Sequence, residues 1–179
     1  KINKFSLFWF FSMIFKIKKK IRELNPRYVI YHGDTMSTAA AAIASSKLLN
    51  TKKNWKNLHL EAGLRSGSLF EPFPEEISRI ISDYFSDMLL AVSDLTEKNL
   101  QKYKNNKEII KVGNTIIDSA DISYNIAKKM KIKKPKGEYA LINLHRHENL
   151  NNKERLKKIT RILESVKIKA IWPLHDNTT

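Results

Sequence analysis

The sequence contains no cysteine among its 179 residues, and only five glycines and five prolines. Without cysteine the chain can form no disulfide framework, no thiolate nucleophile and no cysteine-ligated zinc site, so cysteine-dependent enzymes are excluded. It also lacks a phosphate-binding loop and a GxGxxG motif, so neither a P-loop NTPase nor a dinucleotide-dependent dehydrogenase is supported. The absence of cysteine is compatible with a cytoplasmic location.

Long hydrophobic runs are absent as well. The most apolar segment, Phe5–Phe15, has 11 residues, whereas a membrane-spanning helix needs about 20. No small-residue cleavage pattern follows it, which argues against a signal peptide. Apolar residues continue at Ile17, Ile21 and Leu24, so this segment predicts a buried or interface helix that ends before Pro26. No membrane segment is predicted.

Negative charge is scarce, because 18 Asp and Glu face 33 Lys and Arg, which gives a net charge of +15. Such an excess suggests nucleic acid or an anionic membrane as a partner. However, 26 of the basic residues are Lys and only 7 are Arg. Dispersed Lys is typical of a solvated surface, whereas base recognition favours the planar fork of Arg. We therefore predict no nucleic-acid partner, and a basic nucleic-acid-binding module stays as the alternative from another class.

Short hydrophobic strands alternate with amphipathic helices along the chain. Strands are expected at 28–31, 57–60, 88–92, 109–112, 139–144 and 170–174, with helices at 5–24, 36–49, from 74 onward, 94–103, 119–130 and 153–166. This alternation is typical of an α/β protein with Rossmann-like, mostly parallel sheets. A basic Pro- and Gly-containing connector follows the fifth helix, so we expect domains at 1–117 and 118–179.

Titratable residues gather where the predicted strands end. All five histidines lie within or just after the end of a strand: His32, His59, His145, His147 and His175. Asp34 and Glu61 lie at the same ends, and Glu75 and Glu76 open the helix that begins near Pro74. Because ligands of parallel sheets bind outside the carboxyl ends of the strands, this pattern predicts a catalytic cleft. No spacing typical of metal ligands supports a metal or a cofactor.

Each of these residues also has a purely structural interpretation. Asp34 with Thr35 is a typical cap for the Ala-rich helix that follows. Glu75 and Glu76 are favourable charges at a helix N-terminus. His145 followed by Arg146 is compatible with a surface pair. Glu61 is harder to explain structurally, because a carboxylate at a strand end needs a partner or water.

Six segments in register resemble the non-hydrolysing UDP-N-acetylglucosamine 2-epimerases. They are HGDTMSTAA from His32, HLEAGLRSG from His59, EPFPEEISR from Glu71, VGNTIIDS from Val112, LHRHEN from Leu144 and WPLHDN from Trp172. The resemblance implies a glycosyltransferase-B-type architecture, in which two Rossmann-like domains face each other across a cleft and the second holds most of UDP. Residues 1–117 would then be the C-terminal part of the first domain, and 118–179 the N-terminal part of the second.

The resemblance also implies a reaction and its residues. The family converts UDP-N-acetylglucosamine to UDP-N-acetylmannosamine by eliminating UDP to a 2-acetamidoglucal and re-adding it with inversion at C2. Matched position by position, Asp34, Glu61, Glu75 and His145 are the expected catalytic residues, with acid and base roles left open. Arg146, His175 and Arg65 are the expected substrate-binding residues. No cofactor is implied, and the family suggests a cytoplasmic homodimer.

The resemblance covers residues 26–179, and two parts of the family pattern are missing. The phosphate-contacting loop would precede Lys1, and the Gly-rich segment that grips UDP would follow Thr179. We therefore interpret the chain as a fragment and expect it to be inactive alone, while the parent protein is an epimerase. Three alternatives stay open: a hydrolysing epimerase, another sugar-nucleotide enzyme, and a non-catalytic paralogue that senses UDP sugars.

Overall fold

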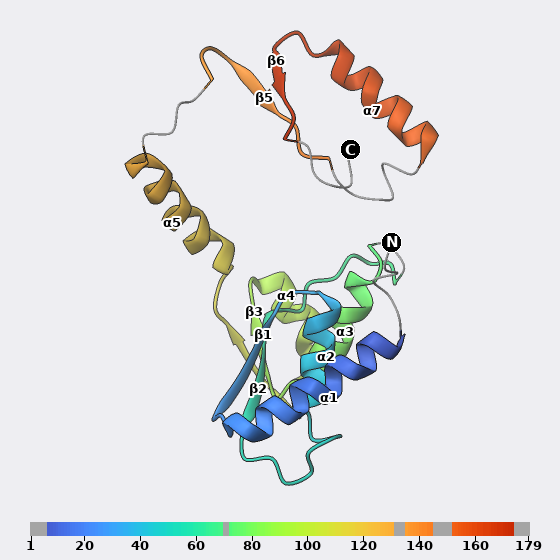
Figure 1. Cartoon of the computed structure of the whole chain (residues 1–179), viewed down its shortest axis with the longest axis vertical. Coiled ribbons are helices and arrows are strands. Elements are labelled where there is room, and N and C mark those ends of the chain that lie inside the picture. The colour runs from blue at the N-terminus through green and yellow to red at the C-terminus, as the bar shows by residue number, and fades with distance from the viewer. Residues whose placement is uncertain (1–6, 70–71, 131–134, 145–151, 174–179) are drawn as a thin grey trace. The chain divides into compact units, whose positions relative to one another are not determined.

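The computed structural model describes residues 7–69, 72–130, 135–144 and 152–173 (Figure 1). The chain forms two compact units, Lys1–Tyr124 and Asn125–Thr179. Helix α5 (Thr115–Lys129) runs across this division, so the boundary expected between residues 117 and 118 falls inside a helix. Each unit is an α/β structure with a parallel sheet.

The first unit is built on a four-stranded parallel sheet with the order β1-β2-β3-β4. Its strands are β1 (Tyr28–His32), β2 (Lys56–Ala62), β3 (Met88–Ala91) and β4 (Glu108–Lys111). All four predicted strands of this region are therefore present. Because the strands are parallel and follow the chain order, all their carboxyl ends lie at the same edge of the sheet.

Three helices cover one face of this sheet: α2 (Met36–Ser45), α3 (Glu75–Phe85) and α4 (Asp94–Leu100), the last continued by the 3-10 turn η1 (Gln101–Tyr103). The row Tyr31, His59, Leu89 and Ile109 is in register across the sheet. Leu89 packs with Leu100 of α4, whereas His59 contacts α3. This row therefore faces the helices, and it positions the side chains described below.

Helix α1 (Leu7–Leu24) packs against α2 (Figure 1). Ile14 lies against Ala40 and Ala44, whose small side chains let the two helices approach closely. Around this contact Leu7, Phe8 and other large apolar side chains of α1 remain exposed. Within the described ranges, no helix is both long enough and apolar enough to cross a membrane.

Helix α3 turns a polar side toward the protein interior. Its buried residues are Glu76, Ser78, Ser82 and Asp83, whereas Tyr84 of its apolar stripe is 62% exposed. The apolar periodicity predicted the helix itself. This polar side can be buried because residues of the sheet and of the loops opposite it supply the hydrogen-bond partners that buried polar groups need.

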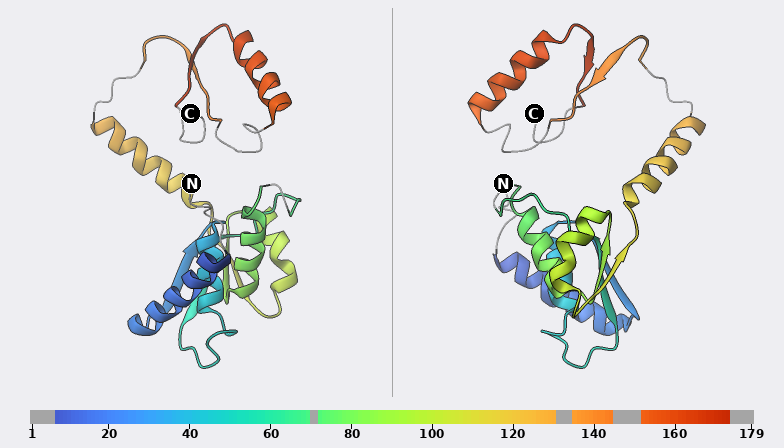
Figure 2. Two further views of the ribbon diagram at one scale, coloured as in Figure 1. Left: turned by 45° about the vertical axis from the view of Figure 1, so that its right-hand side comes forward. Right: turned by 180° about the vertical axis from the view of Figure 1, so that it is seen from behind.

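The second unit is a βαβ arrangement. Strands β5 (Tyr139–Leu141) and β6 (Lys169–Ile171) pair in parallel, and α7 (Lys153–Ser165) connects them, as both views in Figure 2 show. None of the residues described in this unit is buried. The second unit therefore shows the predicted topology without a core of the kind found in the first.

Candidate functional site

The turn after β1 and the end of β2 lie side by side at the carboxyl edge of the sheet. The Gly33 N–H donates to the Leu60 carbonyl at 3.2 Å, and His32 Nε2 lies 3.2 Å from Glu61 Oε1. The side chain of Glu61 is 21% exposed and that of His32 is 57% exposed, so this pair is open to solvent. A carboxylate and an imidazole, both able to exchange protons, thus meet at this edge.

Glu61 has an unusual backbone conformation. Its φ of 64° lies in the left-handed region, which costs a non-glycine residue about 1–3 kcal/mol. The register between β2 and β3 shifts between Leu60 and Ala62, which makes Glu61 the irregular position of the strand. Such irregularities redirect a side chain near a strand end. Here Glu61 Oε2 comes within 3.8 Å of a Cβ placed on Gly33, so Glu61 points toward the β1 turn.

Arg79 of α3 joins two carboxylates at the same edge. Its Nη2 donates to Asp34 Oδ2 at 2.5 Å and its Nη1 donates to Glu76 Oε2 at 3.0 Å. Glu76 Oε2 also accepts the Ser66 N–H at 3.0 Å, which ties the loop after β2 to α3. Burial lowers the pKa of Arg79, but its bonds to Glu76 and Asp34 outweigh burial and raise the pKa overall. Arg79 is therefore a permanent cation that fixes both acids.

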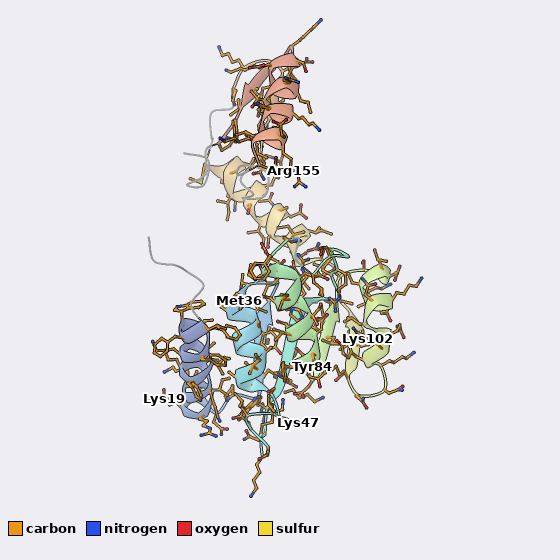
Figure 3. All side chains as sticks on the ribbon, turned by 90° about the vertical axis from the view of Figure 1, so that its right-hand side faces the viewer. Lys19, Met36, Lys47, Tyr84, Lys102 and Arg155 are labelled. Carbon is orange, nitrogen blue, oxygen red and sulfur yellow. The ribbon has the colours of Figure 1, made fainter. Side chains whose placement is uncertain are left out.

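The N-terminus of α2 is capped by Thr35. Its side chain accepts the Thr38 N–H, and Thr38 Oγ1 donates to the His32 carbonyl at 2.7 Å. Asp34, which is equally compatible with a cap on sequence alone, is instead paired with Arg79. Across from this helix end, Ser78 Oγ of α3 lies 3.2 Å from the sulfur of Met36, the residue labelled at the start of α2 in Figure 3.

A fully buried carboxylate, Asp83, lies beneath the turn that carries Glu61. Its Oδ1 is 2.6 Å from His59 Nδ1, and its Oδ2 accepts from Arg65 Nη2 at 2.6 Å and from the Gly63 N–H at 3.3 Å. The other ring nitrogen of His59, Nε2, is 2.8 Å from the Gly33 carbonyl. One carboxylate of α3 therefore contacts the chain both before and after Glu61.

Gly63 is required at its position. Its φ of +82° is in the left-handed region, and a Cβ there would lie 2.3 Å from the Thr96 carbonyl oxygen of α4. Asn99 of α4 also donates to the Gly63 carbonyl at 2.9 Å. The turn after Glu61 thus passes directly against α4, and no larger residue fits without displacing backbone.

The structure describes three of the four predicted catalytic residues, all in the first unit. Asp34 lies in the loop after β1, Glu61 lies near the carboxyl end of β2, and Glu75 lies in the first turn of α3, next to the buried Glu76. The predicted substrate-binding residue Arg65 also lies at this edge, with its guanidinium directed to Asp83. The other predicted residues lie outside the described ranges: His145, Arg146 and His175.

Two residues that organise this edge were not predicted from the sequence. Asp83 and Arg79 both lie on α3 and belong to its polar stripe, which an amphipathic pattern assigns to solvent. The spacing of Glu76, Arg79 and Asp83, at i, i+3 and i+7, was a usable signal, because it places three charges on one side of the helix. Over the part of the chain that the structure describes, no group of three or more acids and histidines is placed to hold a metal ion.

A family model supplies the decisive comparison. The model described as UDP-N-acetylglucosamine 2-epimerase matches residues 10–179 of the chain. The chain belongs to the UDP-N-acetylglucosamine 2-epimerase family. The resemblance inferred from the six sequence segments is thereby confirmed, and so is the Rossmann-like α/β fold expected with it.

Curated epimerases resemble the chain along most of its length. The UDP-N-acetylglucosamine 2-epimerase of Methanocaldococcus jannaschii is 36% identical over 180 residues, a match that covers 93% of this chain and 47% of the relative. The UDP-2,3-diacetamido-2,3-dideoxy-D-glucuronate 2-epimerase of Pseudomonas aeruginosa is 33% identical, with 93% and 47% covered. The chain spans about half the length of the curated relatives it matches.

Solved epimerase structures share the fold. The M. jannaschii UDP-GlcNAc 2-epimerase in complex with UDP-GlcNAc and UDP superposes with a TM-score of 0.74 at 33% identity, covering 94% of this chain and 48% of that one. The Neisseria meningitidis enzyme bound to UDP-GlcNAc gives a TM-score of 0.74 at 25% identity, with 99% and 50% covered. These epimerases are of glycosyltransferase-B-like architecture, of which this chain covers about half.

Proposed function

We propose that the parent protein, of which this chain is a part, interconverts UDP-N-acetylglucosamine and UDP-N-acetylmannosamine by inverting C2 of the sugar, and that the chain alone is inactive. The observation that carries this proposal is the gathering of Asp34, Glu61 and the acids of α3 at the carboxyl edge of the first sheet, in a chain of the epimerase family. Solved members of the family bind UDP-GlcNAc, which supports the same class of substrate.

The proposed route eliminates UDP and then adds it back. A base removes the C2 proton as the C1–O bond to UDP breaks, which leaves a 2-acetamidoglucal and UDP. Re-addition delivers a proton to the opposite face of C2 while UDP returns to C1. Because the C2 hydrogen is not acidic, the reaction requires several positioned acids and bases. The loop after β1 supplies Asp34, and the end of β2 supplies Glu61 with His32 beside it.

Roles in the second unit complete the proposal. His145, Arg146 and His175 are proposed to contact the diphosphate or to protonate the leaving group, and Arg65 to act near the substrate. The proposal further includes a cytoplasmic homodimer without a nucleic-acid partner. The apolar side chains that α1 exposes, including Phe8 and Phe11, support a protein partner on that helix. Light scattering tests the dimer, and titration with duplex DNA at two salt concentrations tests the absence of nucleic-acid binding.

The direct test is product analysis by NMR after incubation of the parent protein with UDP-N-acetylglucosamine, because this chain spans only about half the length of its curated relatives and is expected to be inactive alone. We expect UDP-N-acetylmannosamine as the product, and we expect Glu61→Gln to abolish turnover because an amide cannot exchange the proton. Glu23→Gln, on the exposed side of α1, is the matched control and should retain the wild-type rate. Equal turnover by Glu61→Gln and wild type would contradict the proposal.

One observation favours a second substrate. The P. aeruginosa relative, at 33% identity, is named for a diacetamido glucuronate sugar. The same assay should therefore also be run with UDP-2,3-diacetamido-2,3-dideoxy-D-glucuronate. A higher kcat/KM for this sugar than for UDP-N-acetylglucosamine would reassign the substrate. Release of free N-acetylmannosamine with UDP would instead identify the hydrolysing reaction.

A further inference from the structure

The strand that leads to Glu61 is anchored by His59, whose ring is buried between two partners. The His59 side chain is 1% exposed and that of Asp83 is 0% exposed. Nδ1 faces Asp83 Oδ1 at 2.6 Å, and Nε2 faces the Gly33 carbonyl at 2.8 Å. The Tyr31 ring lies against the imidazole, with centroids 5.8 Å apart.

The hydrogen-bond partners determine where the protons of His59 are. A carbonyl oxygen can only accept, so Nε2 must carry a hydrogen to bond with Gly33. Asp83 accepts from the guanidinium of Arg65 and from the Gly63 N–H, and both of these donors favour its ionised form. An ionised carboxylate can only accept as well, so Nδ1 must also carry a hydrogen. Both ring nitrogens are therefore protonated.

We propose that His59 is a buried imidazolium that acts as a positioning residue for Asp34 and Glu61. This inference rests on the proposed function only for its effect on turnover, because the charge follows from the contacts alone. His59 ties the Gly33 turn, which leads directly into Asp34, to the Asp83 carboxylate. Asp83 in turn holds Gly63 and Arg65, so the left-handed turn at Glu61 is fixed on both sides.

The charges around His59 are compatible with this state. Asp83 from α3 and Arg65 from the loop after β2 form an ion pair at 2.6 Å, and His59 shares the same carboxylate. The titratable side chain that faces the ring from β1 is Tyr31. A buried cation needs a charged partner and further hydrogen bonds, and the imidazolium has both in Asp83 and the Gly33 carbonyl.

The charge is tested by NMR of protein labelled with nitrogen-15 in histidine. Two-bond couplings distinguish an imidazolium from either neutral tautomer, and contact with the Tyr31 ring assigns the His59 signals. We expect both nitrogens of His59 to carry hydrogens in the folded protein, as the contacts with Asp83 and the Gly33 carbonyl require. A ring that carries only one hydrogen in the folded protein would overturn the assignment.

The positioning role is tested by hydrogen exchange, which does not depend on any activity. In His59→Gln the amide of Gly63, and that of Gly33, should exchange at least about tenfold faster relative to the Val112 amide, which follows β4 and donates to the Ala91 carbonyl. Asn57→Ala, on the same side of β2, is the matched control and should leave these ratios unchanged. Should His59→Gln not fold, His59→Asn gives the second test, because it also removes the contacts of the imidazole with Asp83 and the Gly33 carbonyl. Unchanged ratios in the folded variant would overturn the positioning role.

The kinetic consequence separates this role from substrate binding. His59→Gln should lower kcat about tenfold or more while KM changes less than about threefold, since the residue orients catalytic groups without touching substrate. A rise in KM at unchanged kcat would contradict the positioning role. If the wild-type protein shows no epimerase activity, the proposed function fails, while the NMR and exchange results still decide the inference about His59.

Discussion

Two buried polar networks lie on the helix-facing side of β2, and they differ in chemistry. At the amino end of the strand, the Asn57 amide donates to Tyr31 Oη, Ser45 Oγ and the Phe85 carbonyl at 3.2, 3.1 and 2.9 Å. At the carboxyl end, His59 is held between Asp83 and the Gly33 carbonyl. The first network joins helices to strands, whereas the second joins α3 to the Gly33 turn before Asp34 and to the end of β2 that carries Glu61.

The comparison shows that burial of polar groups does not by itself mark a functional site. Asn57 and His59 are both buried as whole residues. The hydrogen-bond partners of each side chain come from several elements. They differ in the edge of the sheet that they contact. Asn57 lies at the amino end of β2, whereas His59 contacts the Gly33 turn at the carboxyl edge, where the loops of a parallel sheet converge. We therefore expect the Asn57 network to govern stability alone, and the His59 network to govern both stability and turnover.

The largest expected effect is that of Asp83→Ala. Removing this carboxylate leaves His59 and Arg65 without their shared anion, and breaking a buried pair in this way costs about 3–5 kcal/mol. Urea unfolding measures the loss. Asp94→Ala is the control, because that side chain is 87% exposed in its pair with Lys111 and should change stability by less than about 0.5 kcal/mol. An equal loss of unfolding free energy in Asp83→Ala and Asp94→Ala would show that the buried Asp83 contacts stabilise the protein no more than the exposed pair.

Asn57→Ala should destabilise the protein by about 1–3 kcal/mol, because it leaves buried partners such as Tyr31 and Ser45 unsatisfied. The turnover number per folded molecule should stay at the wild-type value. Urea unfolding and kcat, measured on the same preparation, check both statements. A tenfold fall in kcat would mean that the amino-end network also serves the site, and the comparison would fail.

Arg79→Lys should lower kcat about tenfold, equivalent to about 1.4 kcal/mol, with a smaller change in stability. The guanidinium fork contacts Asp34 and Glu76 at once, whereas a lysine ammonium cannot reproduce this planar two-point contact. Steady-state kinetics and urea unfolding check the two effects. A variant with wild-type kcat would show that Arg79 does not position Asp34.

The smallest effect concerns Tyr31, which lies between the two networks. Burial raises the pKa of Tyr31, against the hydrogen bond to Ser86 that lowers it. A raised folded-state pKa means that stability is fully present below the unfolded pKa of about 10 and is lost as pH rises above it. Wild type should therefore lose up to about 1.4 kcal/mol per pH unit above 10, a loss that Tyr31→Phe should not show.

Urea unfolding at about pH 8 and about pH 11 measures this difference between the two proteins. Other tyrosines and lysines titrate equally in both, so only the difference in slope reports on Tyr31. Identical pH dependence in wild type and variant would show that the Tyr31 hydroxyl ionises as easily in the folded protein as in the unfolded chain.

Most of the fold could be predicted from the sequence. A chain in which short strands alternate with amphipathic helices fits few topologies, and these are α/β folds with a parallel sheet. The ends of two elements differ from those predicted. Helix α5 begins at Thr115, before the expected Ser119, because the Asn114 side chain accepts the Ile116 N–H and starts the helix earlier. Strand β5 ends at Leu141 rather than 144.

The candidate site could be predicted only in part. Asp34 and Glu61 follow the strands predicted at 28–31 and 57–60, so a parallel topology is sufficient to place them at one edge of the sheet. Asp83 and Arg79 could not be placed in this way, because a polar stripe on a helix normally faces solvent. Only the contacts of His59 and Asp34 show that the stripe faces inward. The interior side of α3 is thus a property of the tertiary structure rather than of its periodicity.

The measurement that tests the central claim most directly is the appearance of solvent deuterium at C2 of the nucleotide sugar in heavy water. Elimination and re-addition replace the C2 hydrogen with one from solvent, so the wild-type parent protein should incorporate deuterium at C2. Glu61→Gln should incorporate none, and Asn57→Ala should incorporate deuterium at the wild-type rate per folded molecule. Epimerised product without deuterium, or equal incorporation by Glu61→Gln, would contradict the account.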